Sequence, residues 1–468
     1  MTKDIKKDPL VTAYIPTYNY GQYIEQAINS VLNQTYKSWE LIIINDGSTD
    51  KTDEIISKYE DNERVTIVRQ ENKGLTITSN IALRLSKGKY IVRLDGDDYF
   101  DENALLVMVN HMEQNRDVGL VYPDYYLVDG DGEIISIERR AKVGAEVELL
   151  DMPAHGACTM FRKNLLLELG GYNEEITCQD GYDIWIKFIQ HYKTSNINLP
   201  LFFYRQHTAN ITKDKKKLLE TRRLIKKRYA EIKLKMLKKN KIGRVAIIPV
   251  RAHSDFEFRL ALKKIFGEPV IDYTLDEAIG SKRFHKIIVV SEDDVILDYG
   301  RRRYPRITCV KRPLSYSRRN IMLEKTIEYV FKELKLSKEF YEEIMILNIE
   351  TPLRTKKNIN KAIDTMHVFD TDSVISLSET IGPHYAHEKH GMVRIGNTER
   401  FRLERKNIYK GNGSILLIKT KNLSTNSIEG IKRGHMIMLR EESVRLISEF
   451  DFLIAQMLLK RRKINAKT

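Results

Sequence analysis

Short apolar runs alternate with helical patterns along the first quarter of the chain. The strand-like runs cover residues 11–15, 41–44, 65–68 and 89–94. The helical patterns cover residues 22–32, 51–59, 75–85 and 102–112. Because strands that alternate with helices need crossover connections, we expect an α/β fold with a mostly parallel sheet covered on both faces. Ligands should then gather at the carboxyl ends of the strands.

A second series of strand-like runs follows later in the chain and predicts a second α/β domain with its own core. These runs cover residues 244–249, 286–290, 344–348, 373–377 and 414–418. Between the two series, Leu218, Ile225 and Ile232 recur every seven residues, which predicts an amphipathic helix. At 468 residues the chain is too long for one ordinary core. We therefore expect a first domain at 1–212, a helical linker at 213–243 and a second domain at 244–468.

The positive charge of the chain is concentrated in the predicted linker. The formal net charge is +14, and residues 213–241 alone carry 14 lysines and arginines against three acids. The basicity is therefore local, and a general nucleic-acid-binding surface is not indicated. We favour a helix that packs one stripe on a neighbouring domain over one that contacts an anionic membrane.

Cysteine content and hydropathy indicate in which cellular compartment the protein is expected. Cys158, Cys178 and Cys309 are widely spaced and match no metal-ligand pattern, so we expect reduced thiols and no zinc site. No apolar run reaches the ~18 residues of a membrane-spanning helix, and the first residues resemble no signal peptide. We expect a cytoplasmic protein. Peripheral contact with the inner face of the membrane through the basic linker is the alternative.

The acidic run that follows residues 89–94 is the clearest chemical signal of the first domain. If the strand stays extended, Asp95 and Asp97 project from the same face at its carboxyl end. Mg²⁺ and Mn²⁺ take oxygen ligands, and one or two carboxylates together with substrate phosphates form a suitable site. The residues thus suggest that a divalent cation and a diphosphate bind together. An acidic turn that caps the helix near Glu102 is the structural alternative.

Two other predicted strands of the first domain also end in polar residues. Residues 16–20 follow the first strand, and residues 45–50 follow the second. A carboxylate at Asp46 can accept hydrogen bonds from a nucleobase or a ribose, while Gly47 and Ser48 allow the turn to close. Each stretch alone could be a helix cap. Because three such polar stretches follow three different strands, they favour a ligand site.

The order and spacing of these stretches resemble the family-two inverting glycosyltransferases, which have the GT-A fold. The resemblance covers roughly residues 9–212 and is specific for the family but not for the substrate. The motifs are Ile15-Pro-Thr-Tyr-Asn19, Asn45-Asp-Gly-Ser-Thr-Asp50, Asn72-Lys-Gly-Leu75, Leu94-Asp-Gly-Asp-Asp98, Gly170-Gly-Tyr-Asn-Glu174, Cys178-Gln-Asp-Gly-Tyr-Asp-Ile-Trp185 and Tyr204-Arg-Gln-His207.

The resemblance implies a role for each matching residue. Asp46, with Pro16 and Tyr18, would hold the nucleoside of a sugar nucleotide. Asp95 would face the ribose and the metal, Asp97 would be the main ligand of Mg²⁺ or Mn²⁺, and His207 would help to hold metal or diphosphate. Asp180 would be the catalytic base that deprotonates the acceptor hydroxyl. Because the family usually has Glu-Asp where this chain has Gln179-Asp180, Asp183 is the fallback base.

The second half resembles the cytidylyltransferases that activate sialic acids as CMP-sugars. The matching stretches are residues 246–251, 267–274, 289–293, 351–355, 412–414 and 449–452. Asp255 stands where that family has a lysine, and residues 260–261 are Leu-Ala in place of Lys-Asn. Residues 445–447 are Arg-Leu-Ile where the family has its Asp-x-Asp metal site. Because triphosphate needs cations around it, we expect a degenerate domain, with Arg251, Arg354 and Asn412 as remaining ligand candidates.

Three hypotheses follow for the whole chain. The leading one is a metal-dependent inverting glycosyltransferase of hexosyl or N-acetylhexosaminyl type, with a glycan, a lipid-linked glycan or a protein as acceptor. The degenerate domain would serve acceptor recognition, donor tethering or formation of a homodimer. The second is a bifunctional enzyme that also makes a CMP-activated nonulosonic acid. The third is a nucleotide-sugar-binding scaffold without turnover, which the survival of the carboxylates disfavours.

Overall fold

The computed structural model describes residues 8–138, 156–176, 178–207, 215–236, 242–253, 257–318, 321–380, 384–388, 391–395, 408–424 and 427–465. These residues form two compact units. The described residues up to Ile225 belong to the first unit, and those from Lys226 onward belong to the second. No helix within the described ranges has the length and apolar character needed to cross a bilayer.

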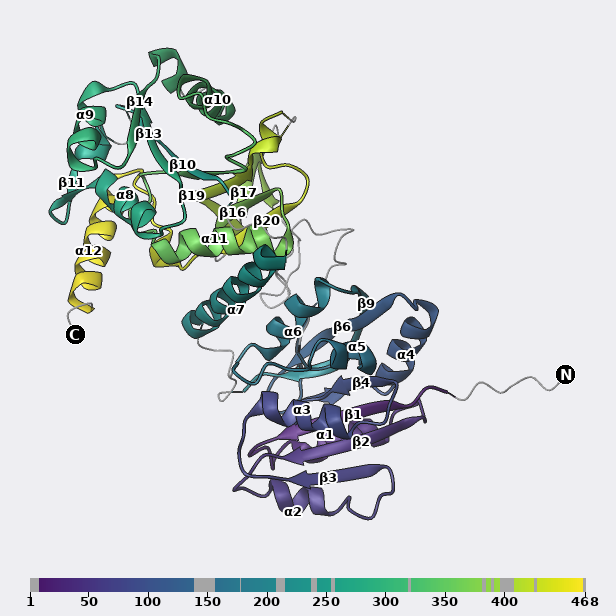
Figure 1. The fold of residues 1–468 in the computed structure, drawn as a ribbon. Helices are drawn as coiled ribbons and strands as arrows, with labels where there is room; N and C mark the ends of the chain where they lie inside the picture. Colours follow the sequence, from purple (N-terminus) through teal and green to yellow (C-terminus); the bar gives the residue numbers. More distant parts are fainter. Residues whose placement is uncertain are drawn as a thin grey trace. The chain divides into compact units, whose positions relative to one another are not determined.

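The first unit is built on one sheet whose first half is parallel, as expected (Figure 1). The parallel strands lie in the order β3-β2-β1-β4 and span Val65–Arg69, Trp39–Asn45, Val11–Thr17 and Tyr90–Arg93. The sheet then becomes mixed, because β8 (Met160–Arg162) runs antiparallel to β4. Beyond it lie β6 (Val118–Val128), β9 (Lys193–Arg205) and β5 (Tyr99–Phe100), while β7 (Ile134–Glu138) pairs with β6.

The described part of the first unit contains six α-helices, in addition to the amino-terminal half of α7. They are α1 (Ile24–Leu32), α2 (Thr52–Ser57), α3 (Leu75–Leu85), α4 (Ala104–Gln114), α5 (Lys163–Glu168) and α6 (Asp180–Ile189). Alternate residues of β1 define the core, since Val11, Ala13 and Ile15 pack in one hydrophobic cluster with side chains of α1 and α4. β1, β2 and β4 are parallel, so their carboxyl ends meet at one edge of the sheet.

Helix α7 (Lys215–Met236) follows within the predicted linker. Its residues up to Ile225 belong to the first unit and the remainder to the second. Ile225, Tyr229, Ala230 and Lys226 are buried, whereas Leu218 and Ile232 of the predicted stripe are half-buried. Residues 213–214 and 237–241 of the predicted linker lie outside the described residues.

The second unit contains a seven-stranded mixed sheet in the order β14-β13-β10-β15-β19-β16-β20. These strands span Thr308–Lys311, Lys286–Ser291, Arg244–Pro249, Glu343–Leu347, Ile408–Lys419, Ser373–Thr380 and Arg433–Ile437. The first four are parallel, and β19 is antiparallel to both of its neighbours. Two small antiparallel pairs accompany this sheet, β11 (Lys264–Ile265) with β12 (Glu268–Pro269) and β17 (His384–Glu388) with β18 (Gly391–Ile395).

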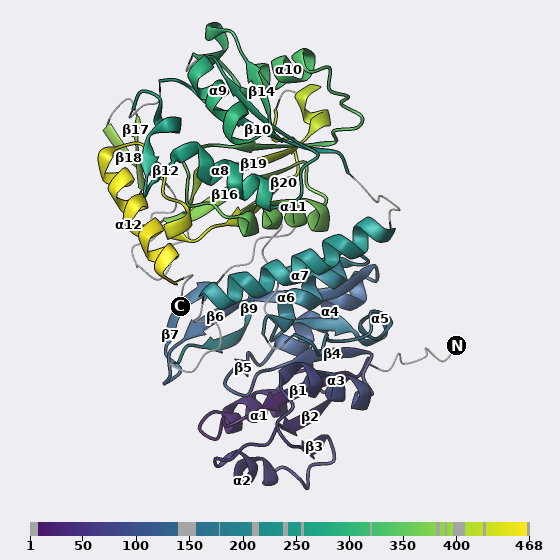
Figure 2. The same ribbon diagram turned by 60° about the vertical axis from the view of Figure 1, so that its left-hand side comes forward.

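Helices cover both faces of this second sheet (Figure 2). One face carries α8 (Val270–Gly280), α9 (Asp294–Arg303), α11 (Lys356–Phe369) and α12 (Glu449–Asn465), and the other carries α10 (Leu323–Glu333). β10 alternates between the two cores, because Ala246 and Ile248 face the first set while Val245 and Ile247 face α10.

Candidate active site

A buried arginine joins two carboxylates at the carboxyl edge of the first sheet. Arg93 is the last residue of β4, and Asp95 and Asp97 continue the chain beyond it. The Nε of Arg93 lies 2.9 Å from Oδ1 of Asp95, and its Nη1 donates to Oδ2 of Asp180 at the start of α6. The guanidinium is only 4% exposed. Arg93 therefore brings the predicted catalytic base next to the predicted donor-binding carboxylate.

Asp97 contacts the second predicted metal ligand directly. The Nε2 of His207 lies 2.9 Å from Oδ2 of Asp97, and both side chains are almost completely buried. The rings of Tyr20 and Tyr23 lie 6.2 Å and 5.6 Å from the imidazole, measured between ring centroids. Burial and the Asp97 carboxylate raise the pKa of the Tyr20 phenol. The phenol of Tyr20 is therefore neutral beside these carboxylates.

Arg205, two residues before His207, holds the acidic turn in place. Its backbone N–H donates to Oδ1 of Asp98 over 2.9 Å, and its Nε donates to the carbonyl of Asp97 over 3.0 Å. Its Nη atoms reach the carbonyl of Gly130 and Oε1 of Gln26. One side chain thus ties β9, the acidic turn and α1 together, which fixes the direction in which Asp97 points.

The buried and acidic surroundings of Asp95 raise the pKa of its carboxyl group. Burial raises the pKa of Asp95 to about 6, Arg93 opposes that rise, and the charges of Asp97 and Asp180 add to it. A cation would relieve this repulsion. Among the described residues no group of three His, Cys, Asp or Glu side chains is arranged to hold a metal. Asp97 and His207 offer one oxygen and one nitrogen side by side, which suits a cation that takes its remaining ligands from a diphosphate.

Asp46, the predicted nucleoside ligand, has both carboxylate oxygens engaged by the neighbouring loop. Oδ1 accepts from Nε2 of Gln70 at 2.6 Å and from the backbone N–H of Lys73 at 2.9 Å. Oδ2 accepts from the backbone N–H of Gly74 at 2.9 Å. These bonds hold the turn that leads into α3. Asp46 therefore shapes the strand-end loop, and the residue is only 5% exposed.

The loop after β1 borders an open hollow of about 380 Å³. Pro16 is buried in β1, whereas the ring of Tyr18 is 46% exposed, so Tyr18 presents an aromatic surface at the strand end. Gly96, in the acidic turn after β4, packs closely against this loop. A Cβ at that position would lie 3.0 Å from Oγ1 of Thr17 and 3.1 Å from a ring carbon of Tyr20. The hollow is lined by residues 19–23, Asp50, Lys51 and His207.

Asp180 begins α6 after a residue in the left-handed region. Gln179 has φ +63°, and its Oε1 accepts from Nε of Arg222 in α7 over 2.8 Å. The Sγ of Cys178 lies 3.2 Å from Oγ1 of Thr221, also in α7. The amino-terminal half of α7 therefore fastens the segment that carries Asp180, a contact that the sequence motifs did not reveal.

The preceding loop is fastened to α3. The side chain of Asn80 accepts from the backbone N–H of Tyr172 and donates to its carbonyl and to Glu174. Gly171 has φ +66°, and a Cβ there would lie 2.6 Å from Oδ1 of Asn80, so glycine is required for this approach. The Gly170 to Glu174 motif thus serves to anchor the loop.

Asp183, the fallback base, lies within α6 and is 1% exposed. Its burial favours Asp180, whose side chain is 11% exposed, for contact with an acceptor. The segment that leads into β8 is described from residue 156 onward. Gly156 packs directly against the guanidinium of Arg93 and leaves no room for a Cβ there.

The three ligand candidates of the second unit have different surroundings. Arg251 is exposed and lines a hollow of about 210 Å³ at the carboxyl ends of the parallel strands. Arg354 is buried and donates to Oγ1 of Thr274 and to the carbonyl of Ser414, and burial lowers its pKa to about 9. Asn412 accepts from the backbone N–H of Ser414. These contacts favour a structural role for Arg354 and Asn412, so Arg251 is the accessible candidate.

Reasoning from the sequence alone missed Arg93, Arg205 and Asn80 as residues that organise the site. An arginine in the apolar run 89–94 was the available signal for Arg93, because a charge inside a buried strand needs a partner. Asn80 carried no comparable signal.

Comparisons with known proteins agree on the first unit. Residues 12–170 match the family described as Glycosyl transferase family 2. The chain is 31% identical over 205 residues to an uncharacterized glycosyltransferase of Methanocaldococcus jannaschii, a match that covers 42% of this chain and 71% of that protein. It is 34% identical over 195 residues to a hyaluronan synthase of Pasteurella multocida and 32% identical over 195 residues to a chondroitin synthase of Escherichia coli.

These matches are partial in length. They cover 42% of this chain, but only 20% of the hyaluronan synthase and 28% of the chondroitin synthase. Among solved structures, S. aureus TarS is similar at 20% identity with a TM-score of 0.39, over 48% of this chain and 39% of that one.

Proposed function

Because the chain belongs to glycosyl transferase family 2, we propose that its first unit moves a sugar from a nucleotide-sugar donor to a growing polysaccharide with inversion at the anomeric carbon. The observation that carries this proposal is the cluster in which Arg93 contacts both Asp95 and Asp180 while Asp97 contacts His207. The proposed donor-binding group and the proposed base thereby lie close together at the end of β4. The names of the hyaluronan and chondroitin synthases support a polysaccharide as the acceptor.

In the proposed reaction Asp180 takes the proton of the acceptor hydroxyl. The hydroxyl oxygen attacks the anomeric carbon, and the bond from that carbon to the diphosphate breaks. A divalent cation held by Asp97 and His207 would neutralise the charge that builds on the departing nucleoside diphosphate. The exposed ring of Tyr18 and the loop shaped by Asp46 would receive the nucleoside.

A panel of nucleotide sugars tests this proposal. We expect one donor to be hydrolysed or transferred in the presence of Mn²⁺, and we expect chelation by EDTA to abolish the reaction. Asp97→Ala should lower turnover at least a hundredfold, because it removes the oxygen ligand of the cation. Asp180→Asn should lower kcat and leave the KM for the donor nearly unchanged.

Asp117→Asn is the matched control, because Asp117 forms an exposed ion pair with Lys193 at the amino-terminal end of β9, the end opposite to Arg205. Its activity should stay close to that of the unchanged chain. Full activity of Asp97→Ala, or full activity in EDTA, would contradict the proposed metal dependence. Donor binding without any turnover would instead favour a scaffold.

A further inference from the structure

Helix α12 carries apolar side chains on two sides. The inner side packs in the core of the second unit through Phe452, Ala455 and Leu459. The outer side exposes large apolar side chains at intervals of three, four and seven residues, which places them on one stripe of the helix. They are Phe450, Leu453, Met457 and Ile464, with exposed fractions of 71%, 57%, 61% and 57%.

The charges of α12 are separated along its length. Glu449 and Asp451 lie in its first turn, and residues 460–463 read Lys-Arg-Arg-Lys near its end. Glu449 is largely exposed and lies 3.6 Å from Nζ of Lys263. The exposed stripe therefore runs from an acidic end to a basic end.

We propose that α12 pairs antiparallel with α12 of a second copy of the chain. A two-fold axis would pass beside Met457, which lies midway along the helix. Phe450 and Ile464 lie seven residues to either side of it, so each would face the other across the pair. The basic end of one helix would lie along the acidic end of the other, which makes the surface self-complementary.

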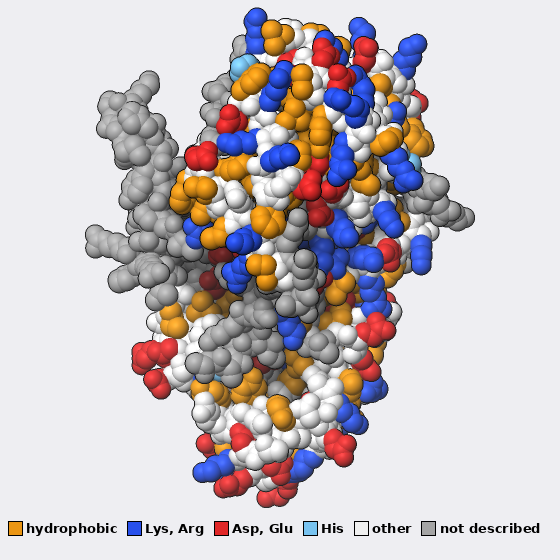
Figure 3. Space-filling model, turned by 90° about the vertical axis from the view of Figure 1, so that its left-hand side faces the viewer, with side chains coloured by type: hydrophobic (Ala, Val, Ile, Leu, Met, Phe, Trp, Pro, Cys, Tyr) orange, Lys and Arg blue, Asp and Glu red, His pale blue; other side chains and the backbone are white. Residues whose placement is uncertain are grey.

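A membrane fits this surface less well. Helices that lie on anionic membranes carry lysine and arginine along the whole polar face. Here Glu449 and Asp451 flank one end of the apolar stripe, and they would be repelled by anionic lipid. On the face drawn in Figure 3, hydrophobic side chains of the second unit lie between basic, acidic and other polar side chains rather than in one broad apolar area.

The expected dimer is of moderate strength. A helix of 17 residues is about 25 Å long. A single helix pair of this length buries less surface than a typical permanent interface. We therefore expect a dissociation constant in the micromolar range, about −8 kcal/mol at 1 μM, and an equilibrium that depends on concentration.

Cysteine cross-linking tests the position of the axis. Met457→Cys should form disulfide-linked dimers under mild oxidation, because the two introduced thiols would meet at the axis. Gln456→Cys is the matched control, because Gln456 is the exposed neighbour one position away and points off the stripe. We expect it to cross-link at least tenfold more slowly. The unchanged chain, with its own three cysteines, sets the background.

Sedimentation equilibrium over a hundredfold range of concentration tests the stripe itself. The unchanged chain should pass from monomer to dimer, and Leu453→Glu should stay monomeric with an unchanged Tm. A monomer at every concentration, or equal cross-linking of the two cysteine variants, would overturn the proposal. So would a monomer that co-sediments with phosphatidylglycerol vesicles and loses this binding in Leu453→Glu, since that result would assign the stripe to a membrane.

Discussion

The guanidinium of Arg93 contacts two carboxylates from distant parts of the first unit, Asp95 and Asp180. Buried carboxylates that lie close together repel each other unless a cation lies between them. The planar guanidinium donates in several directions at once, whereas a lysine ammonium is a single point charge on a flexible stem. Arg93 is therefore a positioning residue whose geometry, and not only its charge, matters for the proposed reaction.

We expect Arg93→Lys to lower kcat/KM at least tenfold, about 1.4 kcal/mol or more. The loss should fall mainly on kcat, because Asp180 loses its fixed orientation while the loop around Asp46 is untouched. Steady-state kinetics with the best donor, together with donor affinity measured by calorimetry, would separate the two effects.

Arg162→Lys is the matched control for this prediction. Arg162 is a partly buried arginine of β8 that donates to the carbonyls of Val118 and Met112, away from the carboxylates. It should lower the Tm without a comparable loss of kcat. Equal losses of kcat in the two variants would mean that Arg93 acts only through stability.

At the residue scale, the sequence predicts the position of a site residue only where that position follows from the local backbone geometry. Asp95 and Asp97 follow one strand, so their common direction could be inferred from spacing alone. That Asp180 lies beside Arg93 depends on how the loop from Gly170 to Gln179 folds against α3 and α7, and no local pattern encodes that path.

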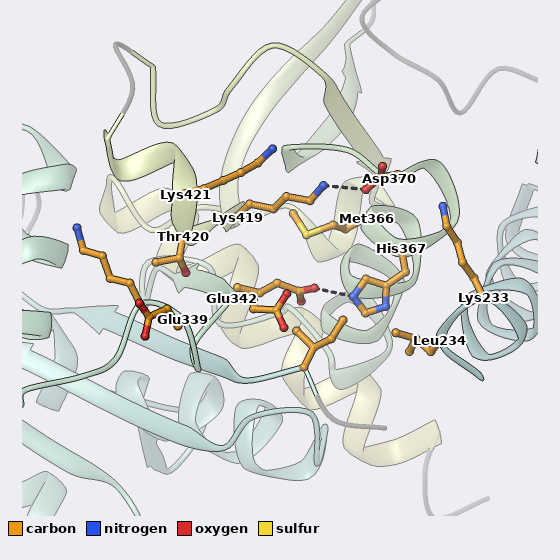
Figure 4. A pocket seen from close by; sticks show the side chains of 13 residues that line it. Lys233, Leu234, Glu339, Glu342, Met366, His367, Asp370, Lys419, Thr420 and Lys421 are labelled. Carbon is orange, nitrogen blue, oxygen red and sulfur yellow. Dashed lines mark hydrogen bonds and ion pairs between the residues drawn. The ribbon is translucent and has the colours of Figure 1, made fainter. Parts of the chain in front are cut away.

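Three elements of the second unit are joined at the amino-terminal edge of its sheet. Glu343 begins β15, Arg244 begins β10, and His367 lies in the last turn of α11. Glu343 accepts from Arg244 at 2.5 Å and lies 2.6 Å from Nε2 of His367, and all three are buried. Glu343 and His367 line a cavity of about 650 Å³, in which Lys419 contacts Asp370 (Figure 4).

This cluster predicts acid sensitivity of the second unit. Burial of Glu343 would raise its pKa, but Arg244 and His367 outweigh that effect and lower the pKa to about 2. Because the folded pKa lies below the unfolded value of about 4.3, the stabilisation is complete above that value and is lost as the pH falls toward 2. Linkage makes the loss on the order of 3 kcal/mol.

Hydrogen exchange of β10, β15 and α11 amides, corrected for intrinsic rates, should therefore show falling protection between pH 5 and pH 3. Glu343→Gln should lower protection at pH 7 and flatten this dependence. Glu339→Gln removes an exposed carboxylate that lines the same cavity and should leave the profile unchanged. A steep profile that persists in Glu343→Gln would assign the acid sensitivity to other groups.

At the element scale, the sequence pattern located β1, β2, β4 and β10 to within about two residues, because each is a short apolar run whose residues are nearly all buried. It missed the parallel strand β14 of the second unit. It also missed β6 and β9, the long strands that extend the first sheet. Each contains a proline, Pro123 and Pro200, and proline ordinarily argues against a strand interior. Both fall where the β6 and β9 register shifts, so the irregularity accommodates them.

The whole molecule joins the proposed transferase to a second α/β unit. We propose that this second unit is a degenerate cytidylyltransferase-like domain. Arg445, at the first of the two positions where the resembled family has metal-binding carboxylates, lies 2.6 Å from Glu350. We propose that this ion pair stands where the resembled family holds its cation. Of the other expected departures, Asp255 lies outside the described residues, while Leu260 and Ala261 are buried.

We expect no CMP-sugar and no pyrophosphate when the full chain is incubated with CTP, a nonulosonic acid and Mg²⁺. Because Arg445 at this edge would repel a metal ion, the negative charge of the triphosphate would not be neutralised there. Ion-exchange chromatography of nucleotides and a coupled pyrophosphate assay measure both products. Added pyrophosphate serves as the positive control, and production of a CMP-sugar would show that the enzyme is bifunctional.

Helix α7 has a practical consequence for anyone who shortens this protein. The first unit extends to Ile225, beyond the boundary at residue 212 that the motifs had predicted. Truncation at 212 would remove Thr221 and Arg222, and with them the support of the segment that carries Asp180. An isolated transferase fragment should therefore retain the helix at least through Ile225. If a shorter fragment is inactive, the cause would be the lost contacts of Thr221 and Arg222 with residues 178–179, rather than the lost second unit.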